Sequence, residues 1–203
     1  FYKLMEMYCV SNSIDYSIFK DDVLKQRCYS IQTGVIEDKI DSMPDRVLSY
    51  LYLAGLYYQK GMWDEAIVNC YKSLQIKPDH AKAHYNLGAA LVQQGKLDEA
   101  ITHFTKALRV KPYFAEAHYS LGIALARQSK LDKAIRHFTE SLRIEPENAK
   151  AHLYLGVTLA RQGKLDEAIK HYTEALRINP NFTAAQESLN KALLLQNKRH
   201  KND

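Results

Sequence analysis

A sequence of 34 residues occurs in three successive, similar copies between residues 81 and 182, and this repetition constrains the possible folds more than any other feature. The copies begin at Ala81, Ala115 and Ala149 and are identical at 17 of their 34 positions. The same spacing separates four prolines, Pro78, Pro112, Pro146 and Pro180. A fixed period of this length is typical of a stacked array in which each unit contacts only its neighbours.

Each copy predicts two helices. In residues 81–94 the apolar or small residues fall at i, i+3, i+4 and i+7, namely His84, Leu87, Gly88 and Leu91. This spacing marks one buried helical face, and residues 97–110 repeat it. Asp98 and Glu99 open the second helix, where the positive end of the helix dipole favours acids.

The turn between the two helices has its own signal. Glycine stands there at Gly61, Gly95 and Gly163, and Ser129 takes the same place in one copy, where a helix must stop and the chain must turn back. Pro112 ends the second helix because proline has no amide proton. Gly88 and Ala100 are small, which we expect to let the two helix axes approach.

This order of residues resembles the tetratricopeptide repeat family. The matching positions are Leu87, Gly88, Ala100, Phe104 and Pro112, whereas His84 replaces the first aromatic residue and Leu91 the later tyrosine. A fourth copy at 47–80 matches through Leu53, Ala54, Tyr57, Gly61, Ala66, Cys70 and Pro78, so the resemblance covers about two thirds of the chain. It implies an all-α, right-handed solenoid of stacked antiparallel helix pairs.

We expect four repeats in residues 47–182, at 47–80, 81–114, 115–148 and 149–182. Residues 1–46 form an N-terminal helical segment, either a degenerate repeat at 13–46 or a family-specific cap or the tail of a preceding domain. Residues 183–203 form a capping helix and a basic tail. The capping helix is expected to turn four residues towards the array, Ala185, Leu189, Ala192 and Leu193.

The charge is +5 in total, but residues 1–46 carry six Lys or Arg against eight acids and residues 47–203 carry 22 against 15. Because basic and acidic residues are interleaved, no basic stripe for a nucleic acid is present, and we expect no nucleic-acid partner. No run of 18 apolar residues exists, so we expect no transmembrane segment and a soluble chain, with the cytoplasm slightly favoured over other compartments.

No catalytic motif is present, and we expect a non-enzyme without cofactors. Cys9, Cys28 and Cys70 show neither a disulfide nor a zinc pattern, and Cys70 occupies a core position. The histidines form two ladders along the array, His84, His118, His152 and His103, His137, His171. Equivalent positions on neighbouring helices lie about 8–10 Å apart, and a metal ion needs three or four convergent ligands, so we expect no metal site.

The candidate functional residues lie opposite the core on each first helix. Counting from the first residue of a repeat, positions 4, 7, 8 and 11 share one side, so positions 2, 5, 6, 9, 12 and 13 share the other. The family resemblance implies that this side forms a concave groove that binds extended or helical peptides. Twelve candidates at these positions are Tyr52, Tyr58, Lys82, Tyr85, Asn86, Gln93, Tyr119, Ile123, Arg127, Lys150, Tyr154 and Arg161.

Lys and Arg outnumber acids among these candidates, so we expect a protein or peptide partner with a few apolar anchors and acidic or carboxylate groups. The family's clamp for the C-terminal carboxylate of heat-shock chaperones is not expected. In the first of two possible registers only Asn86 agrees, while Leu51, Gly55, Glu116 and Ser120 replace the other four residues; the second register also gives one match of five, at Lys150.

The main hypothesis is therefore a non-catalytic protein-protein interaction scaffold. Two alternatives stay open. The chain begins with Phe1, which suggests the substrate-recruiting arm of a larger enzyme such as a glycosyltransferase. The apolar helix from Val47 to Tyr58 suggests a self-assembly module and hence a homo-oligomer if residues 1–46 do not cover it.

Overall fold

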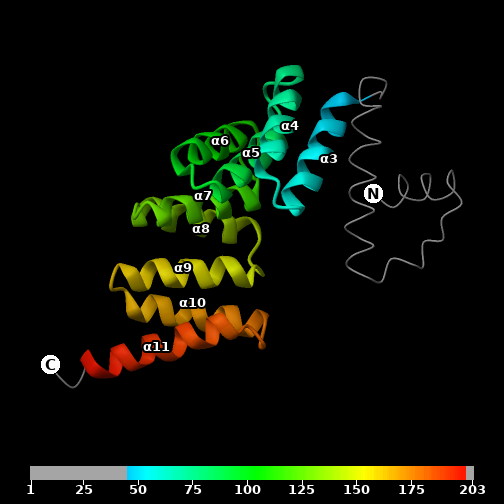
Figure 1. Ribbon diagram of the computed structural model, residues 1–203. Helices are drawn as coiled ribbons and strands as arrows, with labels where there is room; N and C mark the ends of the chain where they lie inside the picture. The colour runs from blue at the N-terminus through cyan, green and yellow to red at the C-terminus, as the bar shows by residue number, and fades with distance from the viewer. Residues whose placement is uncertain (1–44, 200–203) are drawn as a thin grey trace, which may run out of the picture.

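The computed structural model describes residues 45–199, and within this range the chain is an all-α solenoid of nine helices (Figure 1). They are α3 (Arg46–Gln59), α4 (Trp63–Ile76), α5 (Ala81–Gln93), α6 (Leu97–Val110), α7 (Ala115–Arg127), α8 (Leu131–Ile144), α9 (Ala149–Arg161), α10 (Leu165–Ile178) and α11 (Thr183–Arg199). The degenerate repeat predicted at 13–46 and the end of the basic tail lie outside the described residues.

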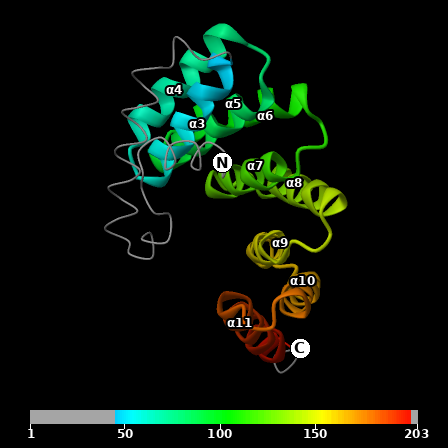
Figure 2. The ribbon, with the colours of Figure 1, turned by 90° about the vertical axis from the view of Figure 1, so that its right-hand side faces the viewer.

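Successive helices pair as antiparallel hairpins, α3 with α4, α5 with α6, α7 with α8 and α9 with α10. The second helix of each pair also packs on the first helix of the next, so the pairs form one continuous stack. The axes of α9 and α10 run across Figure 1 but point towards the viewer in Figure 2, where α7 and α8 lie side-on. The pair of α9 and α10 is therefore rotated about the stack relative to the pair of α7 and α8.

The turn inside each pair requires a left-handed residue. Gly95 has a φ of 75°, and the glycines at the equivalent turns have similar values. Ser129 takes the same conformation with a φ of 59°, although a side chain makes this region unfavourable. The glycine and serine signals in the sequence thus mark the helix-to-helix turns correctly.

The predicted core faces are buried. Leu87, Leu121 and Leu155 are each at most 3% exposed, and Phe104 and Phe138 are fully buried. A Cβ atom at Gly88 would lie 2.7 Å from Cε1 of Phe104, so the helices could not approach this closely with a larger residue there. The small residue predicted at this position is therefore required by the aromatic ring opposite.

The stack has an inner and an outer side. First helices contact first helices of the next pair, α3 with α5, α5 with α7, α7 with α9, and α9 with α11, whereas any contact between second helices of the described pairs is weaker. Closer packing on one side bends a stack towards that side. The first helices therefore line the inner side of the curve.

A ladder of side-chain hydrogen bonds joins successive pairs. Position 14 of the repeat, at the end of the first helix, carries a glutamine whose Nε2 donates to the aspartate at position 18 of the preceding pair. The four bonds are Gln94 to Asp64 at 2.6 Å, Gln128 to Asp98 at 2.8 Å, Gln162 to Asp132 at 2.8 Å and Gln196 to Asp166 at 2.5 Å. Because each bond spans 30 residues, the ladder holds the register between pairs.

The last helix, α11, packs on the stack as a first helix without a second. Ala185 and Ala192, which face α10, are 0% and 3% exposed, and Gln196 continues the ladder. Leu193, predicted to face the array, is instead 38% exposed. Its equivalents in the other pairs are covered by their own second helix, which α11 does not have among the described residues.

Candidate functional site

The candidate surface runs along the inner side of α3, α5, α7 and α9. We use "inner surface" for the twelve residues predicted there, Tyr52, Tyr58, Lys82, Tyr85, Asn86, Gln93, Tyr119, Ile123, Arg127, Lys150, Tyr154 and Arg161. Six are exposed, namely Lys82, Gln93, Arg127, Lys150, Tyr154 and Arg161, and the other six are partly exposed. None of the twelve side chains is sealed inside the stack.

Position 5 of each repeat departs from the expected surface. Leu51 and Leu153 stand at this position and are only 6% and 7% exposed. Ala126, at position 12, is also buried. Position 5 therefore points between neighbouring first helices, and the surface available to a partner comes mainly from positions 2, 6, 9 and 13.

Tyr85 and Tyr119 occupy the same position 5 and are held by other rings. The Tyr85 ring lies 5.0 Å from the Phe114 ring and 6.0 Å from the Phe104 ring, measured between centroids. The Tyr119 ring lies 6.1 Å from that of Phe138. Burial raises the pKa of both phenols, so their rings serve chiefly as packing between repeats and only part of each faces outward.

Tyr154 offers the more open aromatic surface. It stands at position 6, is 39% exposed, and meets the Tyr119 ring edge-on at 5.7 Å. It also stacks near Phe138, with ring centroids 6.3 Å apart. Because its ring is fixed from behind and open in front, Tyr154 can contact a ligand at little cost in side-chain entropy.

Two polar candidates at position 13 bind the preceding repeat instead of pointing freely outward. Nε2 of Gln93 donates to the Tyr58 hydroxyl at 3.0 Å. Nη1 of Arg161 donates to the Ala126 carbonyl oxygen at 2.8 Å, and its Nη2 donates to Oγ of Ser129 at 3.3 Å. Arg161 therefore helps to close the turn after α7, a role that the helical periodicity did not predict.

Lys82, Arg127 and Lys150 are exposed, and none of them makes a hydrogen bond or ion pair within the described residues. Glu116 lies between them on α7 at the same position 2 as the two lysines. The surface thus presents three available cations and one acid. Guanidinium and ammonium groups in this state can bind carboxylates without first breaking an internal pair.

A cavity of about 590 Å³ adjoins one end of the inner surface. It lies between the start of α9 and the loop after α10, and Lys150 forms part of its wall. The apolar part of the lining comes from four residues, Pro146, Ala149, Ile178 and Phe182. Its charged lining consists of two acids, Glu145 and Glu147, and Lys150, and its size suits an apolar side chain of a ligand.

Cys70 is fully buried in the core, as predicted, and burial raises the pKa of its thiol to about 12. A thiol in this state is not a nucleophile at neutral pH. The described residues contain no group of three or more His, Cys, Asp or Glu side chains that could hold a metal ion. They also contain no helix that is long and apolar enough to cross a membrane.

The histidines pair differently from the expected ladders. His84 meets His103 within one helix pair, and the same contact recurs between His118 and His137 and between His152 and His171. The signal was present in the sequence, because the two histidines stand 19 residues apart in each of the three copies. Helical periodicity alone assigns a face and not the partner across the hairpin.

Comparison with known families and structures adds to this geometry. Models described as tetratricopeptide repeat match residues 45–112, 85–149 and 119–182, which together span the four helix pairs. No curated protein sequence matches the chain.

Three solved structures illustrate the similarity. A crystal structure of MamA is 25% identical with a TM-score of 0.70 and covers 80% of this chain and 97% of its own. YrrB, described as a TPR protein with an unusual peptide-binding site, is 22% identical with a TM-score of 0.68 and covers 82% and 86%. The first TPR of Spaghetti (RPAP3), bound to the HSP90 peptide SRMEEVD, is 28% identical with a TM-score of 0.56 and covers 57% and 92%.

Proposed function

Because the chain belongs to the tetratricopeptide repeat family, we propose that it is a non-catalytic interaction scaffold whose inner surface binds a segment of a partner protein. The observation that carries this proposal is the set of exposed side chains on the first helices. Lys82, Arg127 and Lys150 have no internal partner among the described residues, and Tyr154 presents an open ring on the same surface. Such a mixture of rigid aromatic and unpaired basic groups suits recognition of another chain.

The partner segment should carry carboxylates near apolar anchors. Acidic groups would pair with Arg127 and Lys150, and an apolar side chain would enter the cavity beside Lys150. Support for the acidic preference comes from the Spaghetti (RPAP3) structure, whose bound peptide SRMEEVD has two Glu and one Asp. That same peptide is expected to bind weakly here, because only Asn86 agrees with the family's chaperone clamp in the register that begins at 47–80.

A charge-matched pair of variants tests this function. Peptides are first selected from a random library against the full chain, and their affinities are then measured by fluorescence anisotropy. Arg127→Gln with Lys150→Gln should weaken the selected peptides about tenfold, since two exposed charge pairs contribute about 1 kcal/mol or slightly more in total. The control, Lys133→Gln with Lys170→Gln, removes the same charge from exposed positions on α8 and α10.

The outcome separates the hypotheses. A loss of peptide affinity in the first variant and not in the control supports binding at the inner surface. Equal losses of affinity in both variants would mean that only the net charge of the chain matters. If the selected peptides bind both variants as well as the wild type, the basic inner surface has no role. Sedimentation of the chain alone distinguishes the self-assembly alternative, which requires a mass that increases with concentration.

A further inference from the structure

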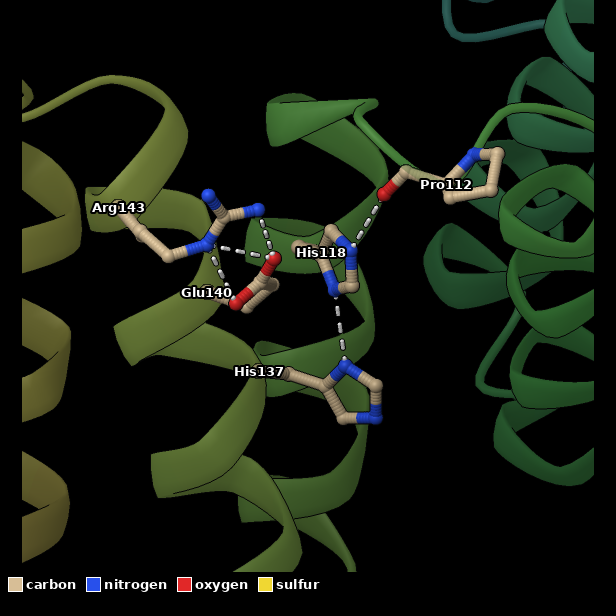
Figure 3. Close-up of polar contacts among 5 residues, drawn as sticks. All are labelled: Pro112, His118, His137, Glu140 and Arg143. Carbon is tan, nitrogen blue, oxygen red and sulfur yellow. Dashed lines mark hydrogen bonds and ion pairs between the residues drawn. The ribbon is translucent and has the colours of Figure 1, made fainter.

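Three histidine pairs recur along the stack with nearly the same geometry. In each pair the first histidine comes from a first helix and the second from its partner helix. The two Nδ1 atoms lie 3.1 Å apart in His84 and His103, and 3.0 Å apart in each of the other two pairs, His118 with His137 and His152 with His171. Figure 3 shows the middle pair with the two Nδ1 atoms facing each other.

The proton positions follow from a second contact. Nε2 of His118 lies 3.0 Å from the carbonyl oxygen of Pro112, and this oxygen can only accept (Figure 3). The Nε2 of His118 therefore carries the proton, and its Nδ1 has a free lone pair in the neutral ring. The proton between the rings must come from Nδ1 of His137. The equivalent prolines fix His84 and His152 in the same way.

This arrangement has the features of a bidentate metal chelate. The observed separations of 3.0–3.1 Å are those of a hydrogen bond between the rings. Two ligand nitrogens at about 2.1 Å from an ion, and at a right angle, also lie about 3.0 Å apart, so an ion can replace the shared hydrogen with little change in the distance between the rings. A metal-binding histidine usually donates its other N–H to a carbonyl, which orients the ring. His118 and His152 already make that bond, to Pro112 and Pro146 at 3.0 and 3.1 Å.

The three pairs differ in what surrounds them. Three residues after the second histidine, on the same helix face, the first pair has Lys106 and the other two have Glu140 and Glu174. The Tyr71 ring also meets the ring of His103, at 6.2 Å. His84 is only 7% exposed, whereas His118 and His152 are both partly exposed. A cation is therefore less favoured at the first pair than at the other two.

We propose that His118 with His137, and His152 with His171, each chelate one divalent transition-metal ion of the nickel and copper class through their Nδ1 atoms. Solvent water would fill the remaining coordination positions, so each ion would have two protein ligands instead of the three or four on which the expectation of no metal site was based. Such right-angle nitrogen ligation is preferred by Ni²⁺ and Cu²⁺. Glu140 and Glu174 each add a negative charge beside their pair, although each is also paired with an arginine, Arg143 and Arg177.

Proton balance is simple at neutral pH. The ion takes the place of the shared hydrogen, and the Nδ1 proton of His137 or His171 moves through solvent to Nε2 of the same ring, so no net proton is released. Burial, followed by the neighbouring histidine, lowers the pKa of both second histidines. The lower pKa favours the neutral form of His137 and His171, which is the form that binds a metal ion.

Calorimetric titration of the full chain with Ni²⁺, free of any affinity tag, tests the proposal. The main variant is His137→Gln with His171→Gln, because glutamine keeps an N–H donor for the facing Nδ1 and so preserves the helix contact. The matched control is His103→Gln, the same change at the pair next to Lys106. Mg²⁺ serves as an ion that prefers oxygen ligands.

The expected result is two Ni²⁺ ions per wild-type chain, at least a tenfold loss of affinity in the double variant, and two ions still bound in His103→Gln. Paramagnetic broadening of amide resonances should centre on α7 with α8 and α9 with α10. Wild-type affinity in the double variant, or equal loss in His103→Gln, would overturn the proposal. If the double variant unfolds, each single variant must instead lose one ion.

Discussion

Replacing Gly122 with alanine tests the close approach that makes the helix pairs possible. A Cβ atom at Gly122 would lie 2.7 Å from Cε1 and 2.8 Å from Cδ1 of Phe138. Carbon atoms in good contact are about 3.5–4.0 Å apart, so the helices or the ring must move by about 1 Å. The matched control is Gly55→Ala on α3, where a new Cβ atom would meet nothing within 4 Å.

The two substitutions should change the free energy of unfolding in opposite directions. Alanine gains about 0.8–1.0 kcal/mol over glycine in a helix interior, and this gain applies to both sites. Overpacking at Gly122 costs about 1–3 kcal/mol, so the net effect there is a loss of about 1 kcal/mol. Gly55→Ala should stabilise by about 0.5–1 kcal/mol, which separates the two variants by about 2 kcal/mol.

The first repeat supplies a natural rescue. It has Ala54 where the others have glycine and Cys70 where they have Phe or Tyr, and both residues are buried. In a Phe138→Cys background, Gly122→Ala should therefore stabilise instead of destabilise. Urea unfolding is followed by circular dichroism and fitted with a nearest-neighbour model. It measures the free energy of unfolding of the wild type, of Gly122→Ala, Gly55→Ala and Phe138→Cys, and of Phe138→Cys combined with Gly122→Ala. If Gly122→Ala stabilises the wild type as much as Gly55→Ala does, the argument from ring contact is wrong.

Three further predictions concern the histidine pairs, the turns and the ladder. Burial, and then the partner histidine, lowers the pKa of His103 and of His137 to about 4, below the ordinary value of 6.5, so protonation favours the unfolded chain. Stability should therefore be full above pH 6.5 and fall as the pH drops from 6.5 to about 4, by about 1 kcal/mol per pair after allowance for partial exposure. Thermal melts of the wild type and of His103→Gln with His137→Gln compare the two pH slopes, and an equal slope would contradict the assignment. Ser129→Gly should stabilise the chain by about 1 kcal/mol or less, because it relieves a positive φ of 59° but removes the acceptor for Arg161. Gly95→Ala should destabilise the chain, because it places a side chain at a positive φ. A lower melting temperature for Ser129→Gly than for the wild type would show that the Arg161 bond outweighs the strain. Gln162→Leu removes the donor to Asp132 and should lower the free energy of unfolding by about 1 kcal/mol. The loss should be seen as faster amide hydrogen exchange at the interface of α8 and α9. Unchanged exchange would mean that the ladder does not hold the register.

Much of the fold could be predicted because periodicity and turn chemistry act locally. The 34-residue period, the glycines at the turns and the burial of Leu87 and its equivalents all depend on interactions within one repeat. The need for a small residue at Gly88 could be predicted for the same reason, since Phe104 belongs to the same pair.

Contacts that depend on side-chain direction could not be predicted in this way. Arg161 stands on the expected face, yet its length lets it reach back to the Ala126 carbonyl. Leu193 has the spacing of a core residue, but its burial depends on a second helix that does not pack on α11 in the described part of the chain. Helical position assigns a direction to the Cβ atom and leaves the end of a long side chain undetermined.

The most direct test of the central claim is an amide chemical-shift map of the full chain with one selected peptide bound. The account predicts that the perturbed residues gather on α5, α7 and α9, around Asn86, Ile123, Arg127 and Tyr154. Perturbations gathered on the outer helices α6, α8 and α10, with the inner surface unchanged, would contradict it.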